Sequence, residues 1–247
     1  TVYGKEEDYT KAPLRANIGF FRSLPASSGS MIRFGDYSAC LSIVVPDYDN
    51  FKGDLKNTTN SVSTLSYVDE SLWVGGSLSK KLDDVSSLGL TVYYTARNYT
   101  RSAQDRSYAG TDSKVFTSEK AIIQNALVPI VGYFYNYSSD LKFGASLRIP
   151  AFPIQGTGSL YETFSDSAVP GSTENLSLDG LSSPIQIPGK LSFGISYLYD
   201  PTLQLTGDFS VYEATSYPDL VTTEGAAITY QHRQIANGSL GLEKAFF

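Results

Sequence analysis

The sequence predicts an all-β protein, an antiparallel transmembrane β-barrel of the bacterial outer membrane. Three observations support this fold class. Several alternating segments run for ten residues or more, tyrosines gather near the ends of these segments, and short polar links alternate with long ones. A tilted strand needs about 9 to 11 residues to cross a membrane, whereas strands of soluble proteins most often have about 5 to 6.

Composition excludes several other classes. Hydrophobic residues make up 41% of the chain and charged residues 18%, with 18 Tyr, 13 Phe and 21 Gly, which favours strands and tight turns. No apolar run reaches the roughly 18 residues of a membrane-spanning helix. A net charge of −6 argues against nucleic acid as a partner. Cys40 is the one cysteine, so an internal disulfide is excluded.

The clearest strands form a hairpin over residues 190–212. Its first arm places Ser192, Gly194 and Ser196 on one face, and its second arm carries Asp208 and Tyr212 on the polar face. The apolar face consists of Leu191, Phe193, Ile195, Tyr197, Tyr199, Leu203, Leu205, Phe209 and Val211. Residues 37–45, 69–82, 87–100 and 141–150 alternate in the same way. A soluble sandwich would alternate too, but long strands and aromatic ends favour lipid on the apolar face.

One segment departs from this pattern. Residues 121–137 are apolar on both faces and contain Pro129, where we expect a kink or bulge because proline cannot donate to the ladder.

The links between strands also predict an orientation. Short links are expected near Ser23–Ser30, Lys81–Ser86, Ser138–Asp140 and Asp200–Thr202. Long surface loops are expected over Asp47–Ser66, Arg101–Glu119, Ala151–Pro188 and Ser216–Glu224. Outer-membrane barrels have short periplasmic turns and longer extracellular loops, so the short links define the periplasmic rim. With residues 227–247 as a single strand, about nine or ten strands result, and single-chain bacterial barrels have an even number, so the chain is expected to be incomplete.

The hairpin resembles a known family. Its residues Pro188, Leu191, Gly194, Tyr197, Pro201, Leu205, Asp208 and Tyr212 match a strand–turn–strand pattern of the outer-membrane long-chain fatty-acid transporters, also called FadL-like. The stretches SIVVPDYDNF and GSLGLEKAFF are similar to an early and a late strand of these proteins. The resemblance implies a barrel that passes fatty acids or aromatic hydrocarbons without chemistry. Members also carry a hatch, which is not identified here, so residues 1–247 are taken as one barrel domain or its larger part.

Alternation also predicts which residues face the lumen and could meet a ligand: Tyr93, Arg97, Arg148, Asp208, Tyr212 and Glu243. These charges either pair across the lumen, or Arg97 or Arg148 holds the carboxylate of an amphipathic ligand through the planar arginine fork. His232, the one histidine, lacks a nearby nucleophile motif, so no catalytic residue, metal or cofactor is predicted.

The sequence leaves three functions open. The first is an outer-membrane transporter of hydrophobic small molecules, with outer-membrane lipid around it. The second is an accessory barrel of a larger envelope complex with protein partners, and the third is a general diffusion porin. The low charge along the predicted lumen argues against the third.

Overall fold

The computed structural model describes residues 15–22, 26–46, 48–58, 60–169, 171–218, 220 and 229–245. These residues form a 13-stranded antiparallel sheet and a separate two-stranded sheet. The all-β class predicted from alternation is confirmed. Within the same ranges, no helix has the length and hydropathy to cross a bilayer.

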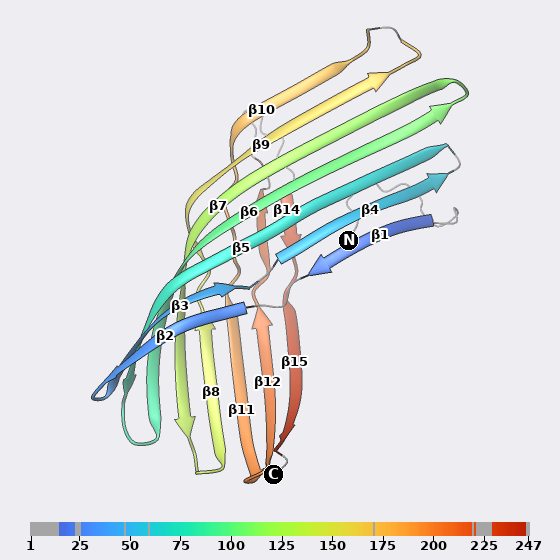
Figure 1. The fold of residues 1–247 in the computed structure, drawn as a ribbon. Helices are drawn as coiled ribbons and strands as arrows, with labels where there is room; N and C mark the ends of the chain where they lie inside the picture. The colour runs from blue at the N-terminus through green and yellow to red at the C-terminus, as the bar shows by residue number, and fades with distance from the viewer. Residues whose placement is uncertain are drawn as a thin grey trace.

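Three long strands form the middle of the sheet (Figure 1). They are β5 (Ser61–Lys81), β6 (Ser86–Ala109) and β7 (Asp112–Asn136), with 21, 24 and 25 residues. Their pairing is continuous from one end to the other. Each is about twice as long as the 9 to 11 residues that cross a membrane, so the sheet has a part that extends beyond the bilayer.

The lower half of the sheet carries the strands that the sequence predicts best. On β5 lies β3 (Tyr37–Val45), followed by β2 (Ala26–Phe34). On β7 follow, in order, β8 (Leu141–Arg148), β11 (Lys190–Asp200), β12 (Leu203–Tyr212) and β15 (Ile235–Lys244). In the described residues, nine strands therefore lie side by side at this level, in agreement with the predicted nine or ten.

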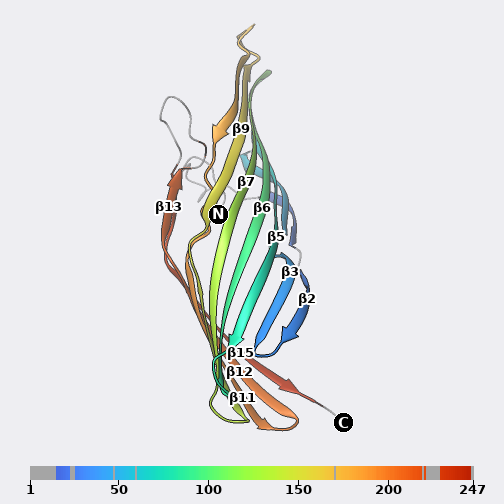
Figure 2. The ribbon, with the colours of Figure 1, turned by 90° about the vertical axis from the view of Figure 1, so that its left-hand side faces the viewer.

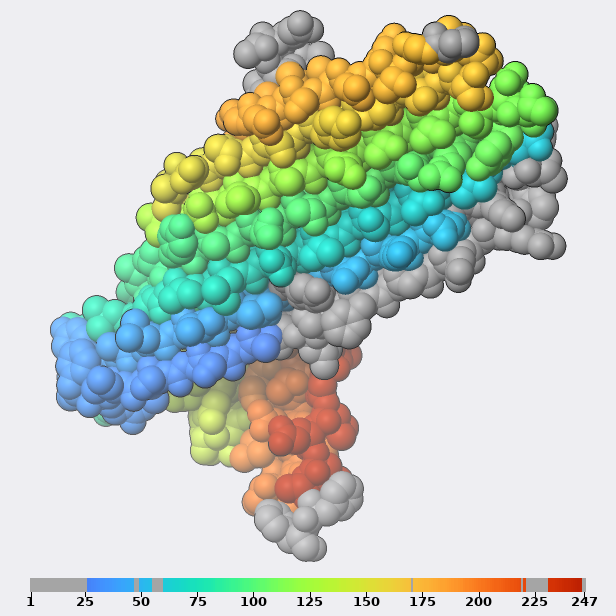
Figure 3. Space-filling model, turned by 45° about the horizontal axis from the view of Figure 1, so that its top comes forward, coloured from blue at the N-terminus to red at the C-terminus, as the bar shows by residue number. Residues whose placement is uncertain are grey.

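The upper half is built from other strands on the same three. On β5 lies β4 (Tyr48–Thr58), followed by β1 (Arg15–Arg22). On β7 lies β9 (Phe152–Asp166), followed by β10 (Glu174–Ser182). Figure 3 shows the upper part of the sheet from orange β10 to light-blue β4, with β9, β7, β6 and β5 in between.

The upper half corrects the predicted long loops. Residues 101–119 are the ends of β6 and β7, joined by a tight turn in which Gly110 has a φ of 65°. Residues 48–66 and 152–182 are likewise mostly strand. These segments mix polar and apolar side chains without strict alternation, so alternation gives no clear signal, but the ladder hydrogen bonds form regardless of side-chain polarity. Of the predicted short link Ser23–Ser30, residues 26–30 belong to β2 and residues 23–25 lie outside the described residues; a tight turn is found at Gly35–Asp36.

A separate hairpin leaves the wall above β12 and β15. Strands β13 (Thr215–Pro218) and β14 (Thr229–His232) pair only with each other among the described residues. Residues 227–247 are therefore not a single strand, because β14 and β15 are separated by a break at residues 233–234. Leu220, just beyond β13, is buried against Ile122 and Leu181, which places this segment on the inner face of the upper sheet.

The sheet is strongly curved, so that it has an inner and an outer face (Figure 2). On β6 the outward side chains Leu88, Leu90 and Val92 are 39–49% exposed, whereas Thr95 on the inner face is fully buried. The outward apolar residues continue across the lower half as Leu78, Tyr133, Leu147, Phe193 and Phe209. This is the pattern of a barrel whose apolar face points to lipid.

Candidate functional site

The wall is interrupted between its upper and lower halves beside β7. β9 pairs with β10 as far as Ser182, and β8 pairs with β11 from Lys190 onward. Between them, Ser183–Gly189 leaves the regular ladder and Ala151 N–H donates to the Ile187 carbonyl oxygen at 3.0 Å. We call residues Ser183–Gly189 the crossing segment.

The crossing segment bends toward the inner face at its start. The Ser183 N–H donates to the Gly156 carbonyl oxygen at 3.1 Å, and a Cβ added at Gly156 would overlap the Ser183 carbonyl. The close approach of the Ser183 carbonyl to β9 therefore requires glycine at position 156. Ser183 and Ile185 are 1% and 3% exposed, so the segment is held firmly against the sheet.

A polar network anchors the crossing segment to three strands. Gln124 on β7 donates through Nε2 to the Ser183 carbonyl oxygen and Oγ, both at 3.0 Å. Its Oε1 accepts from Arg97 on β6 at 3.1 Å, and the Arg97 Nε donates to Asp69 on β5 at 2.8 Å. Arg97 therefore has its fork occupied by Asp69 and Gln124. Its guanidinium carbon also lies 5.6 Å from the centre of the Tyr99 ring.

Two cations and an aromatic ring lie where regular pairing resumes. Arg148 and Lys190 are direct partners on β8 and β11, and Lys190 is the partner of Tyr212 on β12. The Lys190 Nζ lies 4.9 Å and the Arg148 guanidinium carbon 5.7 Å from the centre of the Tyr212 ring. Arg148 Nε also donates to the Pro188 carbonyl oxygen at 3.1 Å. This cation–tyrosine cluster forms the lower border of the interruption.

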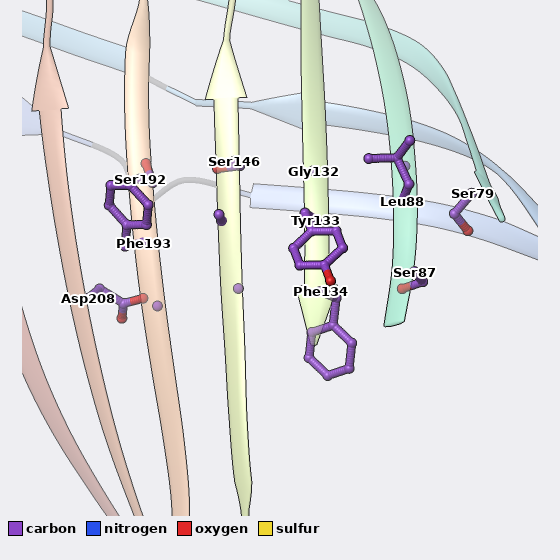
Figure 4. Close-up of a pocket in the computed structure, with 14 residues that line it drawn as sticks. Ser79, Ser87, Leu88, Gly132, Tyr133, Phe134, Ser146, Ser192, Phe193 and Asp208 are labelled. Carbon is purple, nitrogen blue, oxygen red and sulfur yellow. The ribbon is translucent and has the colours of Figure 1, made fainter. Parts of the chain in front are cut away.

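Below the cluster, the inner face is hollowed. A cavity of about 430 Å³ lies over two rows of residues, most of them small (Figure 4). One row runs through Ser79, Gly89, Gly132, Ser146 and Ser192, and the other through Ser87, Phe134, Gly144, Gly194 and Asp208. A Cβ at Gly144 would meet no atom within 4 Å, so this glycine leaves open space.

The predicted site residues do not form one cluster. Arg148 and Tyr212 come together, Arg97 lies in the anchoring network, and Asp208 borders the cavity. Tyr93 is on the inner face, where its hydroxyl is 3.0 Å from Ser42 Oγ. Glu243 lies on β15 opposite Gln204.

Two other residues discussed in the sequence analysis are Pro129 and His232. Pro129 lies within β7, which is continuous there, and the nearest irregularity in its pairing is between Asn125 and Ala126. His232 Nε2 is 3.2 Å from the Tyr217 hydroxyl, in a stacked pair of rings. Among the described residues, no three His, Cys, Asp or Glu side chains gather as metal ligands would.

Sequence reasoning missed four contributors to the site: Asp69, Gln124, Ser183 and Lys190. The alternation of Ser192 and Gly194, extended by one step toward the N-terminus, predicts that Lys190 lies on the same inner face. The crossing segment also carried a signal, since Pro184 and Pro188 cannot donate to a ladder. No pattern in the sequence indicates a role for Gln124, because its strand is apolar on both faces.

Comparisons with known proteins agree with this geometry. No protein-family model and no curated protein matches the chain. Solved structures do match, among them the Ralstonia pickettii toluene transporter TbuX, with a TM-score of 0.55 and 13% identity over 88% of the chain; the CymD monoaromatic hydrocarbon channel, with a TM-score of 0.52 and 13% identity over 94%; and a mutant of the TodX monoaromatic hydrocarbon channel, with a TM-score of 0.55 and 9% identity over 96%.

The chain spans 64% of the TbuX chain, 71% of the CymD chain and 72% of the TodX chain. At 9–13% identity, the likeness is one of fold. The resemblance seen in the hairpin at residues 190–212 is thereby confirmed at that level. The chain has the barrel fold shared by these transport channels for hydrophobic compounds.

Proposed function

We propose that this chain is part of a bacterial outer-membrane channel that moves hydrophobic small molecules without chemical change. The observation that carries the proposal is the interruption of the wall at the crossing segment. In a bilayer, backbone outside a regular ladder is tolerated only where it is buried in protein or lines a cavity. A wall segment that leaves its ladder loses regular main-chain hydrogen bonds, which costs free energy. A path for solutes at this point would explain why the wall is built in this way.

The surroundings of the interruption suit an apolar solute. On the outer side, Phe152 and Ile154 are each 57% exposed, facing lipid. On the inner side, Ile185 and Leu181 are buried in the crossing segment and the strand before it. A solute that moves between the inner cavity and the bilayer would meet apolar surface at both ends of this path.

The cation–tyrosine cluster is the proposed ligand-recognition element. Arg148 can hold a carboxylate through two parallel N–H donors, and Tyr212 offers a ring to an aromatic solute. The similar solved structures include a toluene transporter and monoaromatic hydrocarbon channels, which favours a neutral aromatic ligand. A long-chain fatty acid is the alternative that the hairpin resemblance implies. Outer-membrane lipid surrounds the apolar face in either case.

A reversible cross-link across the interruption tests the proposal. Ala151→Cys and Ile187→Cys are introduced together, because these two residues share a main-chain hydrogen bond. The background is Cys40→Ser, which removes the free cysteine. Uptake of toluene and of oleate into proteoliposomes is measured before and after oxidation. We expect oxidation to reduce uptake at least tenfold and a reductant to restore it. The matched control joins β8 and β11 below the interruption on the outward face, with Phe143→Cys and Ile195→Cys at directly paired positions.

The outcomes separate the candidate functions. Uptake that the Ala151–Ile187 cross-link leaves unchanged would overturn the proposed path. Steady ion conductance in planar bilayers without solute selectivity would indicate a diffusion porin. Stoichiometric co-purification with another envelope protein, with no uptake, would indicate an accessory barrel. Hydrolysis of a lipid substrate would contradict the assignment of transport without chemistry.

A further inference from the structure

The outer face changes character partway up the sheet. On β6 the outward residues from Leu88 to Tyr94 are apolar and exposed, and those from Asn98 upward are polar. At the boundary, Asn98 Nδ2 donates to Glu70 on β5 at 3.3 Å. The apolar part therefore spans about the nine residues that a tilted strand needs to cross the hydrocarbon layer.

A groove of about 380 Å³ lies on the polar part of the outer face. Two rows of outward residues form it across β4, β5, β6, β7 and β9, strands that can be followed in Figure 3. The first row is Asn50, Val68, Thr100, Ala121 and Ser159, and the second is Lys52, Ser66, Ser102, Glu119 and Tyr161. The alternate residues of these strands point to the inner face, so this groove is separate from the transport path.

The chemistry of the groove suits a saccharide. Its floor is made of small side chains with hydroxyl groups, including Thr100 and Ser102, which can both donate and accept hydrogen bonds. Lys52 lies at one end of the second row. Glu119 and the 42% exposed ring of Tyr161 lie at the other. A sugar presents hydroxyl groups along its edges and a C–H face that packs on an aromatic ring.

The height of the groove indicates which saccharide it meets. Thr100 and Ser102 are four and six residues beyond Ala96, the last apolar outward position of β6. At about 3.3 Å per residue and a tilt of about 40°, this is roughly 10 to 15 Å above the apolar band. That level is occupied by the headgroups of the lipids whose acyl chains contact the band, so the groove continues the lipid-facing surface.

We propose that this outer groove binds the core saccharide of lipopolysaccharide in the outer leaflet. The inference rests on the outer-membrane location in the proposed function but not on the transport path. Lys52 would meet acidic or phosphorylated sugars, Tyr161 would pack on a sugar face, and the hydroxyl floor would hold the ring edges. Such a contact fixes the depth and orientation of the barrel in the membrane.

The test measures binding of purified, detergent-solubilised protein to two probes by native mass spectrometry: lipopolysaccharide that carries the core sugars, and lipid A without them. We expect the core-bearing form to bind at least tenfold more tightly. Tyr161→Ala should weaken its binding about five- to tenfold, which corresponds to about 1 to 1.4 kcal/mol. Ser102→Tyr, which fills the floor, should weaken it similarly.

Two control variants show whether the groove itself is responsible. Thr64→Tyr adds a ring on the same outer face one row above the groove, and Tyr108→Ala removes an exposed tyrosine outside it. Neither should change the affinity. Equal affinity for the two probes, or equal effects of groove and control variants, would overturn the inference. Solute uptake is measured on the same preparations, so a channel that binds lipopolysaccharide but does not transport disproves the proposed function alone.

Discussion

At the scale of single residues, Arg97 shows how a charge is accommodated on the inner wall. Its partners Asp69 and Gln124 lie on the two neighbouring strands, so one side chain links β5, β6 and β7. The Arg97 and Asp69 side chains are 32% and 29% exposed, which places them between a surface pair and a buried one. Arg97 thus pairs along the wall, between neighbouring strands, with a carboxylate outside the set of charges predicted to face the lumen.

Asp69→Ala should lower the free energy of unfolding by about 1 to 2 kcal/mol, since it leaves the Arg97 guanidinium without its main acceptor. Urea unfolding in lipid vesicles, followed by tyrosine and tryptophan fluorescence, measures the change. Glu70→Gln is the control, because this outward carboxylate bonds only an exposed amide of Asn98 in the described contacts, and it should change stability by less than about 0.5 kcal/mol. An equal loss in both variants would contradict the role given to the pair.

A second prediction concerns the turn at Asp83, one of the short links that the sequence predicts to lie on the periplasmic side. The main-chain N–H groups of Val85 and Ser86 donate to its carboxylate at 2.9 and 2.7 Å, and these bonds lower the pKa of Asp83. A lowered folded-state pKa means that the stabilisation is present above the unfolded value of about 3.9 and is lost as pH falls through the folded value. Asp83→Ala should therefore unfold more readily than wild type at pH 7, and the difference should shrink as the pH falls below the unfolded value. A difference that stays constant through acid pH would contradict it.

At the scale of elements, the crossing segment depends on one glycine. Gly156→Ala places a methyl group against the Ser183 carbonyl and should push the segment away from β9, at a cost of about 1 to 3 kcal/mol. Amide hydrogen exchange in residues 183–189 should accelerate, which mass spectrometry of peptic fragments detects. Gly144→Ala, on the same inner face with open space around it, is the matched control and should leave this exchange unchanged.

Among the elements, some can be predicted from the sequence and others cannot. Strands such as β11 and β12 were predicted almost to the residue, because lipid on one face enforces strict alternation of Leu191, Phe193 and Ile195. The sequence predicts loops at the upper ends of β6 and β7, since both of their faces meet water there and no alternation is enforced. The network of Asp69, Arg97 and Gln124 required the register of three strands, which no local pattern provides.

At the scale of the whole molecule, the height of the sheet exceeds that of its apolar band. β6 has 24 residues, which at about 3.3 Å per residue and a tilt of about 40° gives roughly 60 Å, against about 25 Å for the apolar band of a membrane barrel. The crossing segment lies near the top of the band, and the groove proposed for lipopolysaccharide lies above it. The level of the membrane boundary therefore decides whether the crossing segment meets the hydrocarbon layer and whether the groove meets the lipid headgroups.

The sole tryptophan makes this boundary measurable. Trp73 lies on the inner face of β5, where its ring centre is 5.7 Å from that of Tyr93. In vesicles of lipids brominated on their acyl chains, the wild-type fluorescence should be quenched weakly. In a Trp73→Phe background, Leu90→Trp should be quenched strongly, because Leu90 is 49% exposed within the apolar band. Thr100→Trp, on the same face of the same strand but above the band, should again be quenched weakly. Strong quenching at Thr100 would place the groove inside the hydrocarbon layer, where its hydroxyl-lined floor could not serve a saccharide and the membrane position derived from β6 would be wrong.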